Sequence, residues 1–297
     1  MIINQQNLDA LFTGYKGAYK RGFEGTTSYW STVAMKVTSM TEKEIYTWLA
    51  QLPSFREWVG DRVIKGLATK GFEIVNRDFE STIAVPRNKI EDDLYGVFTP
   101  MVEEMGRAAA TLPDQLVFDL LAKGFTETCH DGQYFFDTDH PVSYGDEAPI
   151  SVANTDGGSG EPWYLLDTSR AMRPLIYQER RAFNLVRKDD ERDDNVFFRK
   201  EFIYGVDARA SAGFGIWQLA WGSKQALSSA TYAAARTAMQ KFKGEGGRPL
   251  GVKPTVLIVG PSNEQKALEL INAATLASGA GNPWHKTVDV IVTPWAA

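Results

Sequence analysis

Apolar residues recur at helical spacing through the middle of this chain, and this pattern restricts the fold more than any other feature. The positions are Val97, Met101, Met105, Ala108, Ala109, Leu112, Leu116, Leu120 and Leu121. The acidic residues 91–93 precede them and suit the positive end of a helix dipole, whereas Pro113 indicates a kink or a new first turn. The pattern predicts a helix of about 28 residues and about 40 Å, which would act as a structural axis.

The first 40 residues show little regular hydrophobic periodicity and are rich in Gly, Thr and Ser around Tyr29 and Trp30. This composition predicts an extended arm with scattered apolar anchors. Such an arm buries little surface on its own chain, so we expect it to lie on another molecule. The alternative is an ordinary terminus that packs on its own domain.

A predicted helix and then a predicted pair of strands follow this terminus. Thr41 is followed three residues later by Glu44, which resembles a helix start, and Pro53 would end or restart that helix. From residue 62 to residue 87, β-branched and apolar residues alternate with polar ones, as in a strand. They are Val63, Ile64, Phe72, Ile74, Val75, Phe79, Ile83 and Val85.

The turn-forming residues 76–78 divide that alternating run and predict a long two-stranded hairpin. A hairpin on its own is only marginally stable in water, so we expect neighbouring molecules to hold it. The alternative is a pair of strands inside an ordinary sheet.

The second half of the chain is rich in strand formers. Four runs dense in aromatic and β-branched residues are predicted to be strands of one sheet: 163–166, 175–177, 196–204 and 214–221. The charged insert 187–194 separates two of them, as a solvated loop or a subunit-contact loop. The Gly-rich stretch 154–160 is the best candidate for an internal boundary.

The last 75 residues predict an αβαβ unit. Ser228 or Ser229 can cap a helix that the glycines of 244–247 end. A buried strand over 255–259, a helix after Pro261 and a strand over 288–292 complete the unit.

Composition and charge exclude several classes of protein. With 43% hydrophobic and 23% charged residues, the chain is expected to be ordered and globular. Its formal charge of −5 argues against gripping nucleic acid through counterion release. The single cysteine, Cys129, cannot form an intrachain disulfide and fits a reducing compartment. The N-terminus lacks the pattern of a secretory signal, and the apolar runs fall short of the roughly 20 residues that span a bilayer.

The densest group of reactive side chains is Cys129, His130 and Asp131, followed by His140. Thiol, imidazole and carboxylate are ligands that zinc accepts. The adjacent Cys129 and His130 point apart in any regular element, so hydrogen bonding within a loop is the favoured interpretation. The Gly-rich residues 244–251 follow a helix and lack the Gly-Lys-Ser/Thr end of a phosphate loop. We therefore predict no catalytic residue, no cofactor and no metal site, and a structural or binding role.

Several stretches, taken in order, resemble the major head subunits of Mu-like tailed phages. They are Phe55-Arg56-Glu57-Trp58-Val59-Gly60, Glu104-Met105-Gly106-Arg107-Ala108-Ala109, Asp131-Gly132-Gln133, His140-Pro141-Val142, Tyr164-Leu165-Leu166-Asp167, Pro174-Leu175-Ile176-Tyr177-Gln178-Glu179-Arg180 and Leu250-Gly251-Val252-Lys253-Pro254-Thr255. The resemblance covers nearly the whole chain.

The resemblance implies an α+β subunit of the HK97 type. Its expected parts are an N-terminal arm (1–40), a peripheral domain with a spine helix (41–60 and 93–160), an extended E-loop (61–92), peripheral or axial sheet strands (161–222) and an axial αβαβ unit (223–297). The E-loop and arm residues expected to contact other subunits are Ile64, Phe72, Ile74, Phe79, Ile83, Tyr29 and Trp30.

The implied function is that of a major capsid protein, which self-assembles into pentamers and hexamers of an icosahedral phage head enclosing double-stranded DNA. The expected partners are other copies of the chain, a scaffolding protein, a portal protein and, where one exists, a decoration protein. DNA would be enclosed without sequence-specific contact, and assembly would occur in the host cytoplasm without a membrane. Two alternatives remain open: an encapsulin-like nanocompartment shell protein, and a metal-dependent enzyme centred on Cys129, His130 and His140.

Overall fold

The computed structural model describes residues 2–50, 71–92, 94–143, 148–244, 247–276 and 278–297. The helices are α1 (Gln5–Glu24), α2 (Trp30–Val33), α3 (Arg87–Glu91), α4 (Thr99–Ala122), α5 (Asp194–Arg199), α6 (Ser229–Gln240) and α7 (Glu264–Ile271). The strands are β1 (Ala34–Thr38), β2 (Lys43–Tyr46), β3 (Phe72–Val75), β4 (Arg77–Pro86), β5 (His140–Val142), β6 (Ile150–Val152), β7 (Thr155–Gly158), β8 (Trp163–Leu166), β9 (Leu175–Lys188), β10 (Glu201–Phe214), β11 (Ala220–Lys224), β12 (Val256–Val259) and β13 (Asp289–Val292).

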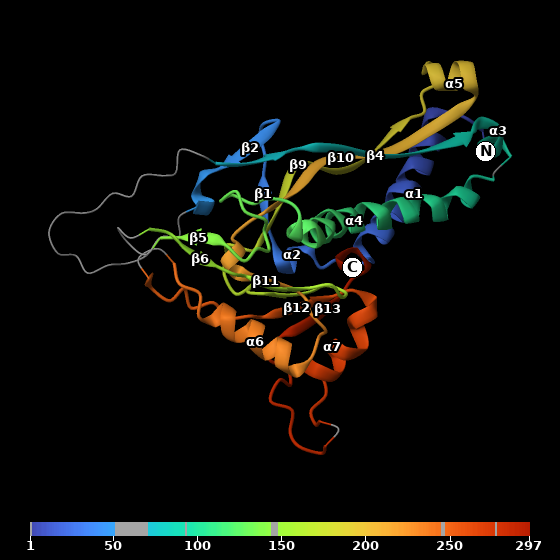
Figure 1. The fold of residues 1–297 in the computed structure, drawn as a ribbon. Helices are drawn as coiled ribbons and strands as arrows, with labels where there is room; N and C mark the ends of the chain where they lie inside the picture. The colour runs from blue at the N-terminus through green and yellow to red at the C-terminus, as the bar shows by residue number, and fades with distance from the viewer. Residues whose placement is uncertain (1, 51–70, 93, 144–147, 245–246, 277) are drawn as a thin grey trace.

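Two lobes share this chain (Figure 1). The elongated lobe contains α1, α4 and a four-stranded sheet in the order β1-β9-β10-β4. The compact lobe contains α6, α7 and a five-stranded sheet in the order β13-β12-β8-β11-β7. Helices beside mostly antiparallel sheets make an α+β architecture. None of the described helices combines the length and apolarity that crossing a membrane requires.

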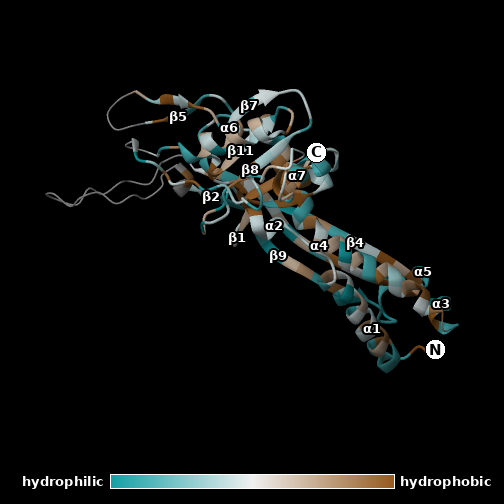
Figure 2. Ribbon diagram, turned by 90° about the horizontal axis from the view of Figure 1, so that it is seen from below, coloured by the Kyte–Doolittle hydropathy of each residue, from teal (hydrophilic) through white to brown (hydrophobic). Residues whose placement is uncertain are grey.

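The long helix α4 confirms the axis that the sequence predicts. It runs for 24 residues and passes through Pro113 without ending. Its first turn holds Pro100 and no acidic residue, so the expected acidic start is wrong: Glu91 instead ends the short helix α3. The polar and apolar alternation along α4 is visible in Figure 2.

The expected extended conformation of the N-terminal residues is wrong. Residues 5–24 form α1, and they bury Leu8, Leu11, Tyr15, Ala18 and Gly22, which lie three or four positions apart. Polar residues and glycines between these positions conceal the helical period. The helix packs along α4, so the alternative of a terminus that packs on its own chain is confirmed for α1.

Two glycines allow α1 and α4 to approach so closely. A Cβ atom added at Gly106 would lie 2.1 Å from the backbone oxygen of Tyr19, and one added at Gly22 would lie 1.9 Å from that of Glu103. Atoms cannot approach to such distances, so only glycine fits at this crossing.

The predicted helix after residue 40 is also wrong within the described residues. Glu44 accepts hydrogen bonds from the backbone N–H groups of Met40 and Thr41, as in a capping box. The chain then continues as strand β2 rather than as a helix. A local hydrogen-bond motif is therefore present, but the pairing of β2 with β3 determines the backbone conformation that follows.

The predicted hairpin with its turn at 76–78 is wrong as well. Strand β3 pairs antiparallel with β2, whereas β4 pairs antiparallel with β10 over ten residue pairs, from Pro86↔Glu201 to Arg77↔Ala210. Asn76 is buried between the two strands instead of turning in solvent. Residues 77–86 thus form the edge of a sheet in their own subunit, and the part of the predicted E-loop at 61–70 lies outside the described residues.

The four aromatic-rich runs do not form one sheet. β9 and β10 belong to the elongated lobe, while β8 and β11 belong to the compact lobe. Residues 196–198 are helical, in α5. The stretch 154–160, expected to be a boundary, contains β7 at the edge of the five-stranded sheet. The chain passes between the two lobes three times, after α4, after β8 and after β10, which the composition of the individual strands does not indicate.

The predicted αβαβ unit at the C-terminus is confirmed. Ser228 caps α6 through a capping box with Thr231, and the parallel strands β12 and β13 flank α7. This unit joins β8 through β12, so it completes the five-stranded sheet rather than forming a separate one. Strand β8 is fully buried in the largest hydrophobic cluster.

Candidate assembly surfaces

The strands β2 and β3 bring together the two ends of a long connection. Tyr46, the last residue of β2, is the register partner of Phe72, the first residue of β3. The connection between these strands therefore begins and ends at neighbouring positions of the pair. Of this connection the structure describes residues 47–50, a 3-10 turn, and Gly71.

A buried polar cluster fixes this strand pair to β9, and we call it the Gln178 cluster: Ser39, Tyr46, Asn76 and Gln178. The hydroxyl of Tyr46 donates to Gln178 Oε1 at 2.7 Å. Gln178 Nε2 donates to Asn76 Oδ1 at 2.8 Å and to the backbone oxygen of Ile74 at 3.1 Å. Asn76 Nδ2 donates to Ser39 Oγ at 2.8 Å. Polar groups in a dry interior bond strongly and in defined directions, so the cluster sets the direction in which residue 46 leaves the sheet.

The predicted contact residues of the E-loop have different environments. Ile64 lies outside the described residues. Ile74 is 3% exposed and packs in the main core of its own chain, so it offers almost no surface to a neighbour. Phe72, Phe79 and Ile83 are half-buried and retain some accessible surface.

The two predicted contact residues of the N-terminal segment are held by the elongated lobe. Trp30 packs on Tyr177 with ring centroids 4.5 Å apart. Tyr29 keeps 40% of its surface exposed, although its backbone N–H is bound. Its partner is Asp114, a carboxylate in the middle of α4 that is 2% exposed.

Asp114 holds the start of α2. Its Oδ1 atom accepts hydrogen bonds from Ser28 Oγ at 2.8 Å and from the backbone N–H groups of Tyr29 and Trp30 at 2.9 and 2.7 Å. These donors stand at the N-terminus of α2, where a helix has unpaired N–H groups. The sequence places Asp114 after a proline, as in a turn, and contains no signal for this role.

Arg187, near the end of β9, attaches the outer part of α1 to the sheet. Its guanidinium pairs with Asp9 of α1 and lies 4.8 Å from the ring centroid of Phe12. It also lies 3.4 Å from the carboxylate of Asp189, which is 5% exposed. Burial raises the pKa of Asp189, and the charge of Arg187 opposes that rise. The hydrogen bond from Arg187 lowers the pKa of Asp9.

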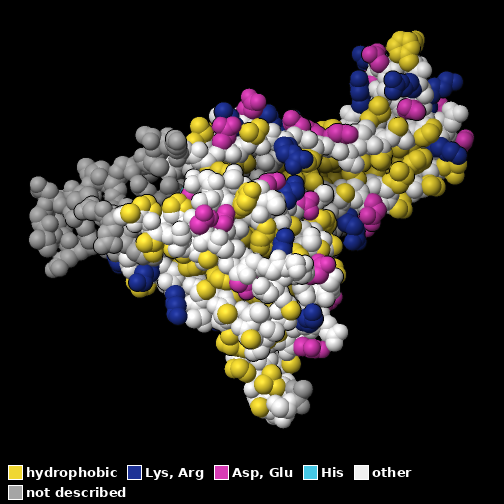
Figure 3. All heavy atoms as spheres, viewed as in Figure 1, with side chains coloured by type: hydrophobic (Ala, Val, Ile, Leu, Met, Phe, Trp, Pro, Cys, Tyr) yellow, Lys and Arg dark blue, Asp and Glu magenta, His cyan; other side chains and the backbone are white. Residues whose placement is uncertain are grey.

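Large apolar side chains are exposed at the outer end of the elongated lobe. Phe197 and Phe198 of α5 are each 75% exposed. Val97 and Met101, beside the start of α4, are 70% and 51% exposed. Figure 3 shows hydrophobic side chains at the projecting end that carries α5. An apolar pocket of about 240 Å³ also lies between α4 and the sheet, and Phe79 is among its lining residues.

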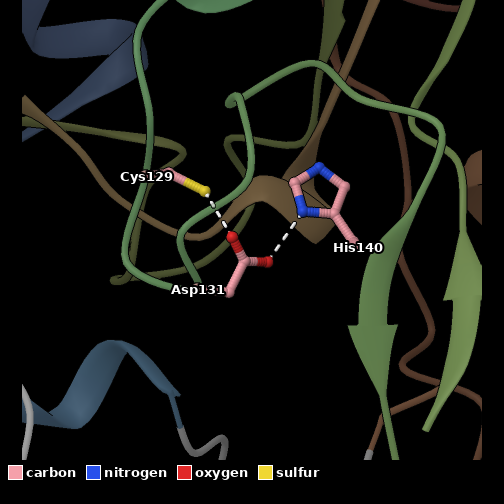
Figure 4. Close-up of side chains that lie close together, drawn as sticks. All are labelled: Cys129, Asp131 and His140. Carbon is pink, nitrogen blue, oxygen red and sulfur yellow. Dashed lines mark hydrogen bonds and ion pairs between the residues drawn. The ribbon is translucent and has the colours of Figure 1, made fainter.

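Cys129, Asp131 and His140 do meet, as Figure 4 shows. Cys129 Sγ donates to Asp131 Oδ1 at 3.1 Å, and His140 Nδ1 lies 2.7 Å from Asp131 Oδ2. Burial raises the pKa of the Cys129 thiol. Burial also favours a raised pKa for Asp131, but the hydrogen bond and charge of His140 outweigh it and lower that pKa. His130 is not part of this group, and burial lowers its pKa.

The distances in this group are those of a hydrogen-bonded chain rather than of metal ligands. Two ligands of tetrahedral zinc with bonds of ~2.0–2.1 Å lie about 3.3 Å apart, and 2.7 Å is shorter than that. The other ring nitrogen of His140 faces Asn154 Oδ1 at 3.2 Å, and Asn154 Nδ2 donates to the backbone oxygen of Phe135. With the His140 ring stacked 4.0 Å from Trp217, the group ties the loop after α4 to the compact lobe.

Comparisons with known proteins find the same family along nearly the whole chain. The family model described as "Mu-like prophage major head subunit gpT" matches residues 8–296. The major capsid protein of Escherichia phage Mu is 41% identical over 285 residues, 94% of this chain and 93% of that protein. The Mu-like prophage FluMu major head subunit of Haemophilus influenzae is 41% identical over 269 residues, 88% of this chain and 87% of that protein.

Solved structures give the same result. A chain of the procapsid of bacteriophage JBD30 is 42% identical, with a TM-score of 0.88, over 99% of this chain and 100% of that chain. A chain of the JBD30 capsid is 32% identical, with a TM-score of 0.76, over 92% of this chain and 91% of that chain.

Proposed function

We propose, from the premise that this chain belongs to the family of Mu-like prophage major head subunits, that its copies form the pentamers and hexamers of an icosahedral phage head enclosing double-stranded DNA. The chain is a major capsid protein with the HK97-type fold, and its role is structural rather than enzymatic. It is a component of the virion capsid, in which copies of the chain form an oligomeric shell. We assign its assembly to the host cytoplasm.

The large accessible surface area of the chain supports the proposal that its interfaces with other subunits are permanent. A compact monomer of 33.0 kDa would expose about 12,500 Å², whereas this chain exposes 16045 Å². The excess, about 3,500 Å², indicates a chain less compact than a typical monomer of this mass, and obligate interfaces, which bury about 2,000–5,000 Å², would cover such surface. Assembly would recover the stabilisation that this shape loses as a monomer.

We propose that the connection 47–71, in place of residues 61–92, contacts neighbouring subunits. Its two ends are paired antiparallel in β2 and β3, and the Gln178 cluster fixes that pair to β9. A connection anchored in this way can lie on a neighbouring subunit while its base stays in register. Among the residues first expected to make contacts, Ile64 lies in this segment and Phe72 at its end.

The remaining partners are proposed from the biology of the family. A scaffolding protein would direct the curvature of the shell, and a portal protein would occupy one vertex. One solved relative is a JBD30 capsid decorated with minor capsid protein trimers. We propose a decoration protein for this shell on that precedent. The negative net charge of −5 fits a container that encloses DNA without sequence-specific contact.

Replacing residues 51–70 with a short Gly-Ser linker tests the assembly role of this connection. The linker joins the 3-10 turn after β2 to Gly71 before β3, so it leaves both strands and the Gln178 cluster unchanged. We expect a folded subunit with native circular dichroism and a yield of closed shells, co-expressed with the scaffold, at least tenfold lower by electron microscopy.

The matched control replaces the same residues with a Gly-Ser segment of equal length. If side chains of the segment make the contacts, this control also fails to assemble; if it only needs to span a gap, the control assembles. Shells of normal size and yield from the short-linker variant would refute the proposed role.

A further inference from the structure

The end of the elongated lobe presents two phenyl rings to solvent. Phe197 and Phe198 are 75% exposed, and their rings meet edge to face with centroids 5.0 Å apart. They occupy α5, which connects β9 and β10 at the far end of those long strands (Figure 1). Aromatic rings in such a position are typical of anchors for a partner.

The turn that carries these rings has a defined structure. Val196 is 3% exposed and packs in the second hydrophobic cluster, below the rings. Asn195 Nδ2 donates to the backbone oxygens of Lys188 and Glu201 at 3.0 and 2.7 Å, which closes the ends of β9 and β10. Lys200 ends the helix in the left-handed conformation with φ 55°. The outward direction of the two rings is therefore fixed by the fold.

The charges around the rings fit a second copy of the same chain. Asp189 is buried, and Arg187 pairs with it and with Asp9. The rest of 187–200 holds four basic residues (Lys188, Arg192, Arg199, Lys200) and four acidic ones (Asp190, Glu191, Asp193, Asp194), so its formal charge is zero. A tip with one sign of charge would repel its own copies when they meet. A tip with both signs can pair with them.

A complementary apolar surface lies at the same end of the molecule. Leu94, Val97 and Met101, between α3 and the first turn of α4, are 44%, 70% and 51% exposed. Two different apolar patches on one subunit allow a head-to-tail contact, which closes into a ring when its rotation permits.

We propose that Phe197 and Phe198 of one subunit pack against Leu94, Val97 and Met101 of a neighbouring copy in the shell. This inference rests on the proposed assembly into shells and adds a contact that does not involve residues 47–71. The charged segment 187–194, for which the sequence leaves a solvated loop and a contact loop open, flanks this interface.

Phe197→Ser/Phe198→Ser tests the proposal, with Phe197→Leu/Phe198→Leu as the control that keeps an apolar tip. The serine variant should unfold at the same urea concentration as wild type, because both rings are exposed, and should give at least tenfold fewer shells. The leucine variant should assemble within about twofold of wild type. Serine-variant shells at the wild-type yield would overturn the proposal.

A crosslinking experiment tests which surface receives the rings. Subunits with Phe198→Cys and subunits with Val97→Cys are co-assembled and oxidised, in a Cys129→Ser background. Mixed disulfide dimers are expected, whereas dimers of Phe198→Cys with itself and none with Val97→Cys would overturn the assigned surface. If wild type forms no shells with its scaffold, the proposed function fails; if wild type assembles and the serine variant does too, only this contact fails.

Discussion

Asp114→Ala should detach the N-terminal segment from α4 and destabilise the unassembled subunit. The Asp114 carboxylate is 2% exposed, and it accepts three hydrogen bonds at Oδ1 and a fourth, at 3.0 Å, from the Tyr29 N–H at Oδ2. Truncation leaves the N–H groups of Tyr29 and Trp30 without this acceptor and leaves space beside the turn. The protein would then lose the cap of α2 and the anchor that precedes β1.

The size of the effect follows from these contacts. A hydrogen bond to a charged group contributes about 1.5–3 kcal/mol, and loss of an N-cap acceptor costs about 0.5–2 kcal/mol. One carboxylate serves all the donors, so the values do not add. We expect the free energy of unfolding to fall by about 3 kcal/mol, which is roughly a 150-fold change in the unfolding equilibrium.

Urea unfolding of unassembled subunits, followed by tryptophan fluorescence, measures this change. Asp114→Asn keeps an acceptor at the Oδ1 position and should lose about half as much stability. Glu104→Ala removes an exposed carboxylate from the same helix, 73% exposed and 3.3 Å from Arg107, and should change stability by about 0.5 kcal/mol or less. A loss below about 1 kcal/mol for Asp114→Ala, or equal losses for Asp114→Ala and Glu104→Ala, would refute the reasoning.

Two further predictions concern helix packing and the loop after α4. Gly106→Ala should lower the free energy of unfolding by about 1–3 kcal/mol, because the added Cβ would meet the backbone oxygen of Tyr19. In the same urea assay Gly14→Ala in α1 should be neutral or stabilising, because the space beside Gly14 is open. Asp131→Asn should cost about 3 kcal/mol at pH 7, because it leaves His140 without its carboxylate. Because its pKa is lowered on folding, Asp131 contributes to the free energy of unfolding above its ordinary pKa near 4, and this contribution is lost as the pH falls through the lowered pKa. Equal costs of Asp131→Asn at pH 7 and in strong acid would contradict this assignment.

Local sequence patterns could not predict much of the candidate assembly surface. The resemblance to Mu-like head subunits supplied the family, but the contact residues chosen by alternation included Ile74, which its own core covers. Gln178 and Asp114 carry no motif, because their roles depend on donors and acceptors that lie far away in the sequence. The sequence pattern predicts a strand at Phe197 and Phe198, whereas the structure places them on an exposed helix.

The sequence by itself determined the elements whose stability is local. The helix α4, the capped helix α6 and the C-terminal strands follow from periodicity, capping and burial within one segment. The tertiary structure decided which strands pair. No pattern within residues 72–86 predicts that β3 pairs with β2, or that β4 pairs with β10, which lies more than a hundred residues further along the chain. Alternation specifies that a strand has two faces, but its partner is chosen by which long-range pairing buries the most apolar surface and satisfies the most hydrogen bonds.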